Sequence, residues 1–257
     1  MKTLTNNQTA ASIELKPFWN RLFQFNWTFG VVLLFAICVP RFIMVLNANM
    51  TGKYGSIGII MTVSAIVPFI FLSKNGREKI GLTLPTNYTW MFYSFIAGIL
   101  ISTVLFIIGR ELYSDTINNW YVYIGKSYYL SEGLNPHDKL IYFLVFATTG
   151  MIFSPIGEEL FFRGIVHSSF SANFGDKKAT IIDSISFALT HLAHFGIVYV
   201  SGLWKFLLMP SIFWMLGMFI ASLVFTKCKK KTGSIIGAII SHAGFNLSMI
   251  YYIFYHL

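Results

Sequence analysis

The chain has 257 residues, of which 55% are hydrophobic and 11% are charged, and its formal net charge is +9. Soluble domains carry charge on about a quarter of their residues, so this composition excludes a soluble protein and predicts one integral membrane domain. The basic residues are dispersed between apolar segments, which indicates membrane topology and no nucleic-acid partner. The two cysteines, Cys38 and Cys228, form neither a CxxC metal site nor a disulfide framework.

Seven apolar windows near 20 residues are long enough to cross a bilayer core of about 30 Å. They cover residues 24–46, 55–73, 88–109, 140–162, 179–200, 206–226 and 234–256. We therefore predict an all-α fold, a polytopic membrane bundle of about seven transmembrane helices. The first window contains Pro40 and Arg41, where we expect the helix to kink or end and Arg41 to extend toward the interface.

The windows divide the chain into three parts. Residues 1–23 form a cytoplasmic N-terminal segment, in which residues 15–22 have the pattern of a short interfacial helix. Residues 24–139 hold the first three spans and a long external loop, 110–139, whose aromatic residues 120–123 we expect in the interfacial belt. Residues 140–257 form the membrane core that carries the polar motifs.

The distribution of Lys and Arg predicts the orientation. If the N-terminus is cytoplasmic, twelve of these residues face the cytoplasm and five, which are Lys53, Arg110, Lys126, Lys139 and Lys205, face outside. This asymmetry agrees with the positive-inside rule and places the C-terminus outside. The composition is typical of a multi-pass protein of a bacterial cytoplasmic membrane.

Charged residues interrupt the fourth window. Each charge at membrane depth costs about 2.5–3.5 kcal/mol, so Glu158, Glu159 and Arg163 indicate a functional site near the predicted cytoplasmic end of that span. Glu159 and Arg163 are four apart, which predicts an ion pair on one helix face. Glu158 lies about 100° round the helix and is free to face a cavity.

Other polar groups can converge on Glu158. His191 lies in the fifth window, and His242 and Asn246 share a face of the seventh. A glutamate in a partly dry cavity can take a proton from water, while a histidine and an amide stabilise an oxyanion. Alternatively Glu158, His191 and His242 hold a divalent metal such as zinc, and the residues alone do not choose between these mechanisms.

Three motifs therefore occur in order on three predicted spans: Glu158-Glu159-x-x-x-Arg163, Phe187-x-x-x-His191 and His242-x-x-x-Asn246. They resemble the motifs of the CAAX-protease and bacteriocin-processing family of intramembrane proteases, often called the Abi family. The resemblance covers about residues 140–250 and implies a CAAX-protease-like core with a cavity that faces the cytoplasm.

The resemblance also implies a role for each motif residue. Glu158 is the base that activates water, helped by His191. His242 and Asn246 form the oxyanion site. The supporting residues are Glu159, Arg163 and Phe187.

We predict an intramembrane endopeptidase that hydrolyses a membrane-associated peptide or protein, as in bacteriocin self-immunity or pheromone peptide processing. The alternative is a non-catalytic membrane regulator or immunity protein that acts by binding a partner. The expected partners are membrane lipid and the substrate, and the oligomeric state stays open. We expect His167 and His194 to be packing residues, and Asp183 to cap a helix or to line the cavity mouth.

Overall fold

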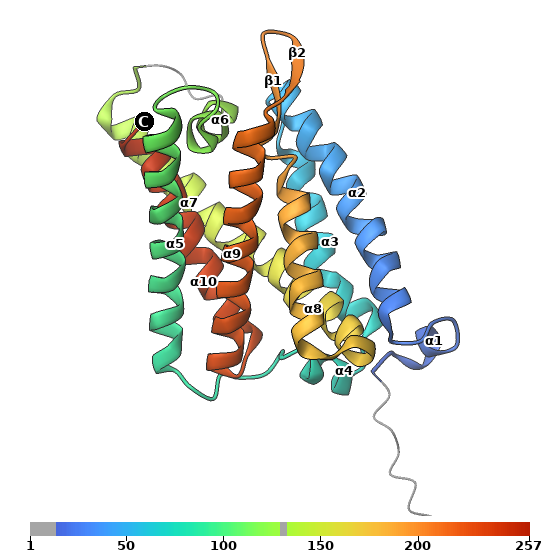
Figure 1. Ribbon diagram of the computed structural model, residues 1–257. Helices are drawn as coiled ribbons and strands as arrows, with labels where there is room; N and C mark the ends of the chain where they lie inside the picture. The colour runs from blue at the N-terminus through green and yellow to red at the C-terminus, as the bar shows by residue number, and fades with distance from the viewer. Residues whose placement is uncertain (1–13, 129–132) are drawn as a thin grey trace, which may run out of the picture.

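The computed structural model describes residues 14–128 and 133–257, which are almost entirely helical (Figure 1). The elements in chain order are α1 Pro17–Asn20, α2 Trp27–Thr51, α3 Gly55–Phe71, α4 Lys74–Lys79, α5 Thr89–Tyr113, α6 Trp120–Ser127, α7 Pro136–Glu159, the π-helix η1 Leu160–Val166, α8 His167–His191, β1 Ile197–Val200, β2 Leu203–Phe206, α9 Leu208–Thr232 and α10 Ile235–Tyr255. The predicted all-α fold is confirmed.

Capping side chains mark where several helices begin. Asn26 accepts a hydrogen bond from the Phe29 amide before α2, and Ser234 accepts one from the Ile236 amide before α10. These bonds satisfy amides that have no partner within the helix. Beyond the caps, apolar side chains cover the outer faces of the long helices, as expected for segments that face lipid.

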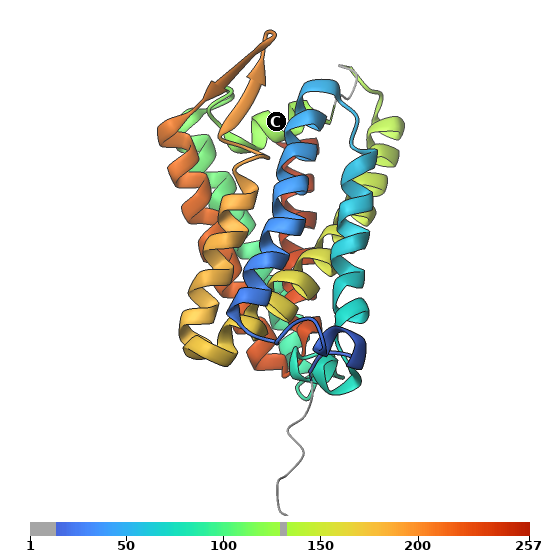
Figure 2. The same ribbon diagram turned by 90° about the vertical axis from the view of Figure 1, so that its right-hand side faces the viewer.

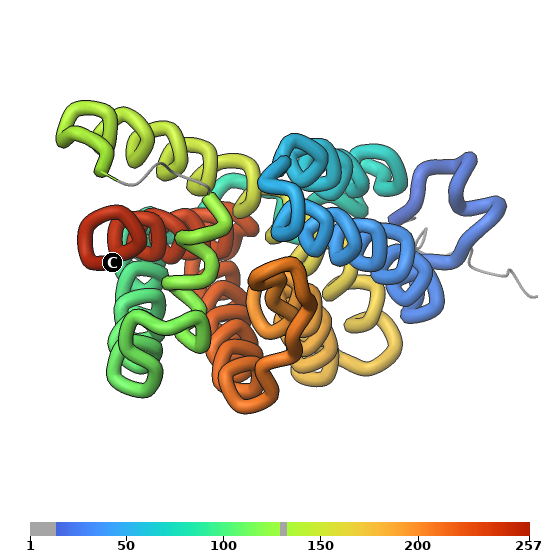
Figure 3. Tube along the Cα trace, turned by 90° about the horizontal axis from the view of Figure 1, so that it is seen from above, coloured from blue at the N-terminus to red at the C-terminus, as the bar shows by residue number. Residues whose placement is uncertain are grey.

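Two groups of helices meet at the centre of the bundle. The helix α10 packs against α5, α7 and α9, whereas α2 packs against α3 and α8 (Figures 1 and 3). The helix α7 also contacts α3, and so it connects the two groups. Figure 2 shows α2 and α3 running along one side of the bundle. The polar motifs lie on α7, α8 and α10, at this junction.

In the described part of the chain, five helical segments are long and apolar enough to cross a membrane: Trp27–Thr51, Thr89–Tyr113, Pro136–His191, Leu208–Thr232 and Ile235–Tyr255. The protein is therefore an integral multi-pass membrane protein. The predicted windows 140–162 and 179–200 fall in one helical run of 56 residues, and α3 is a shorter apolar helix. The count of seven spans stays a prediction.

Two expectations for Pro40 and Arg41 were wrong, because the helix does not end there and Arg41 does not reach the interface. Helix α2 continues through Pro40 to Thr51, and the Arg41 side chain is only 3% exposed instead of reaching the interface. Continuing the helix keeps the backbone hydrogen bonds that lipid cannot replace. An arginine in the middle of the helix therefore points into the bundle.

The fifth predicted window, 179–200, was too long. Helix α8 ends at His191, and β1 pairs with β2 in an antiparallel hairpin in which Ile197 faces Phe206 and Val200 faces Leu203. The hairpin projects from the end of the bundle that also holds α6 (Figure 1). β-Branched and aromatic residues on either side of a short Ser-Gly turn favour such a hairpin.

The residues 120–123 do not form an interfacial belt. Trp120 and Tyr121 are fully buried in α6, where Trp120 packs against Trp214 and the Tyr121 hydroxyl donates to the Ser102 carbonyl at 2.7 Å. These aromatic residues therefore fill the end of the bundle. The Tyr121 ring can occupy its position because its hydroxyl finds an internal partner.

The fourth span also differs from the prediction. The chain stays helical beyond Glu159, through η1 and the first part of α8, and turns at Gly175, whose φ is +77°. Glu158 is therefore in the middle of a kinked helical run rather than near its end. The predicted interfacial helix is reduced to the four residues of α1, and residues 1–13 lie outside the described part.

Candidate active site

The helical geometry changes directly after the two adjacent glutamates. The π-helix η1 begins at Leu160, and all seven of its residues are buried. π-Helical turns are rare in proteins, and those that occur often lie at functional sites. Before them, Gly157 lets α7 approach α3 closely, because an added Cβ would lie 2.5 Å from the Met61 carbonyl oxygen. The two glutamates are thus fixed between a tight helix contact and a π-helix.

Glu158 belongs to a buried cluster with Arg41, Ser154 and His191, which we name the Glu158 cluster. Its Oε1 accepts hydrogen bonds from Arg41 Nη2 at 2.8 Å and from Ser154 Oγ at 2.5 Å. Its Oε2 lies 3.5 Å from His191 Nε2 and has no hydrogen-bond partner among the described residues. One carboxylate oxygen is therefore held by the protein, and the other is buried without a hydrogen-bond partner among the described residues.

The backbone fixes the tautomer of His191. Its Nδ1 lies 2.8 Å from the Phe187 carbonyl oxygen, and a carbonyl only accepts, so Nδ1 carries a hydrogen. A neutral ring then has its lone pair on Nε2, the atom that faces Glu158. Trp214 Nε1 donates to the His191 carbonyl at 3.0 Å and secures the end of α8.

Glu159 forms a second cluster with Arg163 and His242, which we name the Glu159 cluster. His242 Nδ1 donates to Glu159 Oε1 at 2.8 Å, and Arg163 Nε lies 3.2 Å from Oε2 in an ion pair without hydrogen-bond geometry. Glu159 and Arg163 are both fully buried. The carboxylate therefore orients the His242 ring and balances the arginine charge.

Aromatic rings surround the Arg163 guanidinium. Its central carbon lies 4.1 Å from the Phe187 ring centroid and 5.4 Å from that of Phe225. The negative ring faces partly replace hydrogen bonds that its nitrogens do not make within the described residues. Phe187 also contacts the His191 ring at 4.2 Å, so it separates the two clusters and packs against both.

Asn246 lies one turn beyond His242 on α10. Its Nδ2 donates to the Gly150 carbonyl at 2.8 Å, which fixes the amide plane. The same nitrogen carries a second hydrogen, which remains available for a ligand. The His242 ring stacks on Phe225 with an interplanar angle of 13°, so both side chains are held rigidly.

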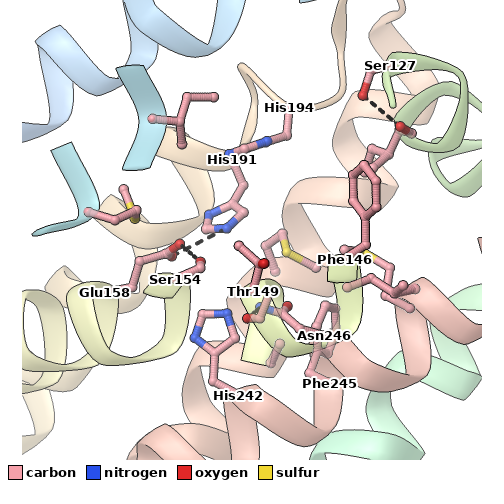
Figure 4. Close-up of a pocket in the computed structure, with 18 of the residues that line it drawn as sticks. Ser127, Phe146, Thr149, Ser154, Glu158, His191, His194, His242, Phe245 and Asn246 are labelled. Atoms are coloured by element: carbon pink, nitrogen blue, oxygen red, sulfur yellow. Dashed lines mark hydrogen bonds and ion pairs between the residues drawn. The ribbon is translucent and has the colours of Figure 1, made fainter. Parts of the chain in front are cut away.

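A cavity of about 270 Å³ adjoins these groups (Figure 4). Its polar lining includes Arg41, Ser154, Glu158, His191, His194, His242 and Asn246. Its walls are mainly apolar and include Met61, Phe146, Trp214, Met218 and Met249. Apolar walls with a few convergent polar groups are typical of a small-molecule or peptide-side-chain site.

The structure brings most of the predicted site residues to this one cavity. Glu158, Phe187, His191, His242 and Asn246 line it, whereas the predicted supporting pair Glu159 and Arg163 lies behind His242. The predicted ion pair between Glu159 and Arg163 is present.

Sequence reasoning missed two members of the Glu158 cluster. Arg41 was interpreted as an interfacial residue, although an intramembrane arginine in a chain with intramembrane glutamates signals a buried pair. Ser154 lies four residues before Glu158, the spacing at which helical side chains meet. Both contacts define how Glu158 is oriented.

The other titratable residues considered above lie in different parts of the structure. His194 lines the cavity, with its ring 5.4 Å from that of His191. His167 Nδ1 lies 2.6 Å from Asp183 and its Nε2 lies 3.1 Å from Asp176, away from the cavity. Asp183 is fully buried, so it neither caps a helix nor lines the cavity mouth as predicted.

A metal ion does not fit the donor set of Glu158, His191 and His242. Arg41 and Ser154 already bind one oxygen of Glu158, and the guanidinium places a positive charge next to any cation there. No group of three His, Cys, Asp or Glu side chains suited to a metal occurs in the described ranges.

A comparison with protein families finds a match to the part of the chain that contains most of the site residues. Residues 140–248 match the family model described as type II CAAX prenyl endopeptidase Rce1-like. No curated protein and no solved structure matches the chain. The matched residues include η1 and all three motifs, whereas Arg41 comes from outside them. The match confirms the predicted resemblance to the CAAX-protease family over residues 140–248.

Proposed function

We propose that the protein is an intramembrane endopeptidase in which Glu158 activates the water that hydrolyses a peptide bond. The observation that carries this proposal is the environment of one Glu158 oxygen. Its Oε2 has no hydrogen-bond partner in the described part of the chain, lies 3.5 Å from His191 Nε2, and belongs to a residue that lines the cavity. A water molecule at this position donates one hydrogen to Oε2 and one to the His191 lone pair.

In the proposed reaction the water oxygen attacks the carbonyl carbon of the peptide while Glu158 takes a water proton. The carbonyl oxygen becomes an oxyanion. The C–N bond then breaks, and Glu158 returns the proton to the leaving amine. The products are a carboxylic acid and an amine, so atoms and charge balance without a further reactant.

The oxyanion is stabilised from the opposite side of the cavity. Asn246 has one free amide hydrogen. We assign the second donor to His242, whose ring the Glu159 carboxylate orients at 2.8 Å. Fixed donors in a water-poor cavity stabilise such an intermediate.

The test uses purified protein in lipid nanodiscs with a mixture of apolar synthetic peptides in ¹⁸O-labelled water. We expect products that carry ¹⁸O in the new carboxyl group with the wild type and a loss of those products with Glu158→Gln. Equal products from both proteins would contradict the proposal. Peptide binding without cleavage by either protein would favour the alternative of a regulator that acts by binding.

The substrate class we propose is a membrane-associated peptide, such as one in bacteriocin self-immunity or pheromone processing. The mainly apolar walls of the cavity support this class, because they suit side chains from a lipid-facing segment.

A further inference from the structure

We infer that the peptide enters the cavity from the non-cytoplasmic side of the membrane, through the end of the bundle formed by the α2–α3 loop and α6. The nature of the ligand rests on the proposed function. The direction of entry rests on the position of the cavity and on the distribution of charge.

The cavity reaches the end of the bundle that holds α6. Its lining includes Asn49 near the end of α2, Tyr54 directly before α3, and Ser127 and Tyr128 at the end of α6. These elements lie at the end that also holds the β1–β2 hairpin (Figures 1 and 2). The cavity therefore extends from the Glu158 cluster toward that end.

Packed helices separate the cavity from the opposite end. His242 lies seven residues after the start of α10 at Ile235, or roughly 10 Å along the helix. On α9 the lining extends no further than Phe225, seven residues before the end of the helix at Thr232. Thr226, Lys229 and Lys230, which follow Phe225 on α9, line a separate pocket instead.

Positive charge is concentrated at the opposite end of the bundle, which we name the basic end. It holds α1, α4, the turn at Gly175 and the last turn of α9 (Figure 1). Its basic residues are Lys16, Arg21, Lys74, Arg77, Lys79, Lys177, Lys178, Lys227, Lys229, Lys230 and Lys231. We name the end that the cavity reaches the open end. It has five basic residues in the described part of the chain, which are Lys53, Arg110, Lys126, Lys139 and Lys205.

Eleven basic residues against five place the basic end in the cytoplasm by the positive-inside rule. The chain also enters its first long helix from the basic end (Figure 1). A cytoplasmic N-terminus and a cavity facing the cytoplasm, both expected from the sequence, are therefore incompatible in this fold. The charge asymmetry favours the cytoplasmic N-terminus, so the cavity opens outward.

This direction narrows the substrate class. The cavity offers Arg41 and Glu158 as its only charged Lys, Arg, Asp or Glu side chains within the described residues, and these two are paired. The walls otherwise present methionine and aromatic side chains. The substrate is thus an apolar peptide segment that is secreted or lies in the outer leaflet, and not a C-terminus displayed in the cytoplasm.

The orientation is tested with two exposed lysines in a background with Cys38→Ala and Cys228→Ala. Lys126→Cys reports the open end, and Lys178→Cys reports the basic end. A membrane-impermeant sulfonated maleimide should label Lys126→Cys in intact cells and Lys178→Cys only after permeabilisation. The reverse pattern, equal labelling of both or labelling of neither in intact cells would overturn the inference.

The entry path is tested with neighbouring threonines on α7. Thr149 lines the cavity, whereas the adjacent Thr148 is exposed outside it. A small charged methanethiosulfonate added to intact cells should modify Thr149→Cys at least tenfold faster than Thr148→Cys. Modification of Thr149→Cys only in inside-out vesicles, or at the same rate as Thr148→Cys, would overturn the inference.

Both labelling experiments are repeated with Glu158→Gln, which the proposed function treats as inactive. Because labelling needs no hydrolysis, the same pattern is expected in this background. Outward labelling together with absence of peptide cleavage would remove the protease proposal and leave the direction of the cavity intact.

Discussion

Glu158 and Glu159 are adjacent in the sequence, yet the fold gives them different environments. Glu158 lines the cavity and keeps one oxygen without a hydrogen-bond partner among the described residues. Glu159 is fully buried, with one oxygen bound to His242 and the other paired with Arg163. Neighbouring identical carboxylates can therefore serve different purposes, because the helix turns them toward different partners.

The arginines repeat this contrast. Arg41 reaches Glu158 from α2 across 117 positions of sequence, and it leaves the far oxygen open. Arg163 reaches Glu159 within one helical segment and lies among the rings of Phe162, Phe187 and Phe225. The Glu158 cluster is therefore suited to act on a ligand. The Glu159 cluster instead holds the neighbouring side chains in place.

The largest expected effect separates the two glutamates by activity. Glu158→Gln should lower the rate of peptide hydrolysis by about 10²–10⁴-fold, because a general base contributes this much. The glutamine oxygen still accepts from Arg41 and Ser154, but the buried Arg41 loses its counter-charge, so the unfolding temperature should also fall and the rate is compared per amount of folded protein. Cleavage at the wild-type rate would show that Glu158 is not the base.

The corresponding change in the neighbouring residue, Glu159→Gln, should lower the free energy of unfolding. Removing one partner of a buried ion pair costs about 3–5 kcal/mol, because it leaves Arg163 uncompensated. We expect lower abundance in the membrane and a lower unfolding temperature. The double variant Glu159→Gln with Arg163→Met should recover part of the loss, and strictly additive losses would argue against a coupled pair.

Asn246→Ala tests the oxyanion donor. The variant should lower kcat by about 10²–10³-fold with little change in KM, which is typical of losing one such donor. The control is Ser248→Ala, because Ser248 lies two residues further along α10 and does not line the cavity. A change confined to KM would assign Asn246 to substrate binding instead.

Arg41→Met tests whether a residue outside the family match positions the base. Misplacing a catalytic group by about 1 Å costs about 10²-fold in rate, so we expect a loss of that order. Arg41→Lys keeps the charge and should restore part of the rate. If both variants hydrolyse peptide at the wild-type rate, Glu158 does not depend on Arg41 for its orientation.

The smallest effect is expected at His194, the cavity histidine that contacts neither glutamate in the described structure. His194→Phe should leave the rate of hydrolysis close to that of the wild type, because the His194 ring contacts neither glutamate. His191→Phe removes the lone pair that faces Glu158 and should abolish turnover. Similar losses in both variants would show that the two histidines act together.

Much of the site was predictable because its members recur at helical spacing. Glu159 and Arg163 are four apart and pair as expected, and His242 and Asn246 share a face and line one cavity. Local spacing decides such contacts, so a sequence is sufficient to find them.

Contacts between distant segments were not predictable in the same way. No local pattern joins Arg41 to Glu158, and hydropathy alone placed the arginine at the interface. The hairpin β1–β2 and the buried ring of Trp120 were hidden in apolar segments that are equally compatible with a membrane span or an interfacial belt. The π-helix after Glu159 depends on packing against other helices, which apolar periodicity does not describe.

The most direct test of the central claim compares the membrane and secreted peptides of three strains: wild type, Glu158→Gln and a deletion. Our account predicts a discrete peptide product that is present with the wild type and absent from both other strains, although Glu158→Gln protein is detected in the membrane. Identical peptides from the wild type and Glu158→Gln, with a phenotype only in the deletion, would contradict it and show that the protein acts by binding.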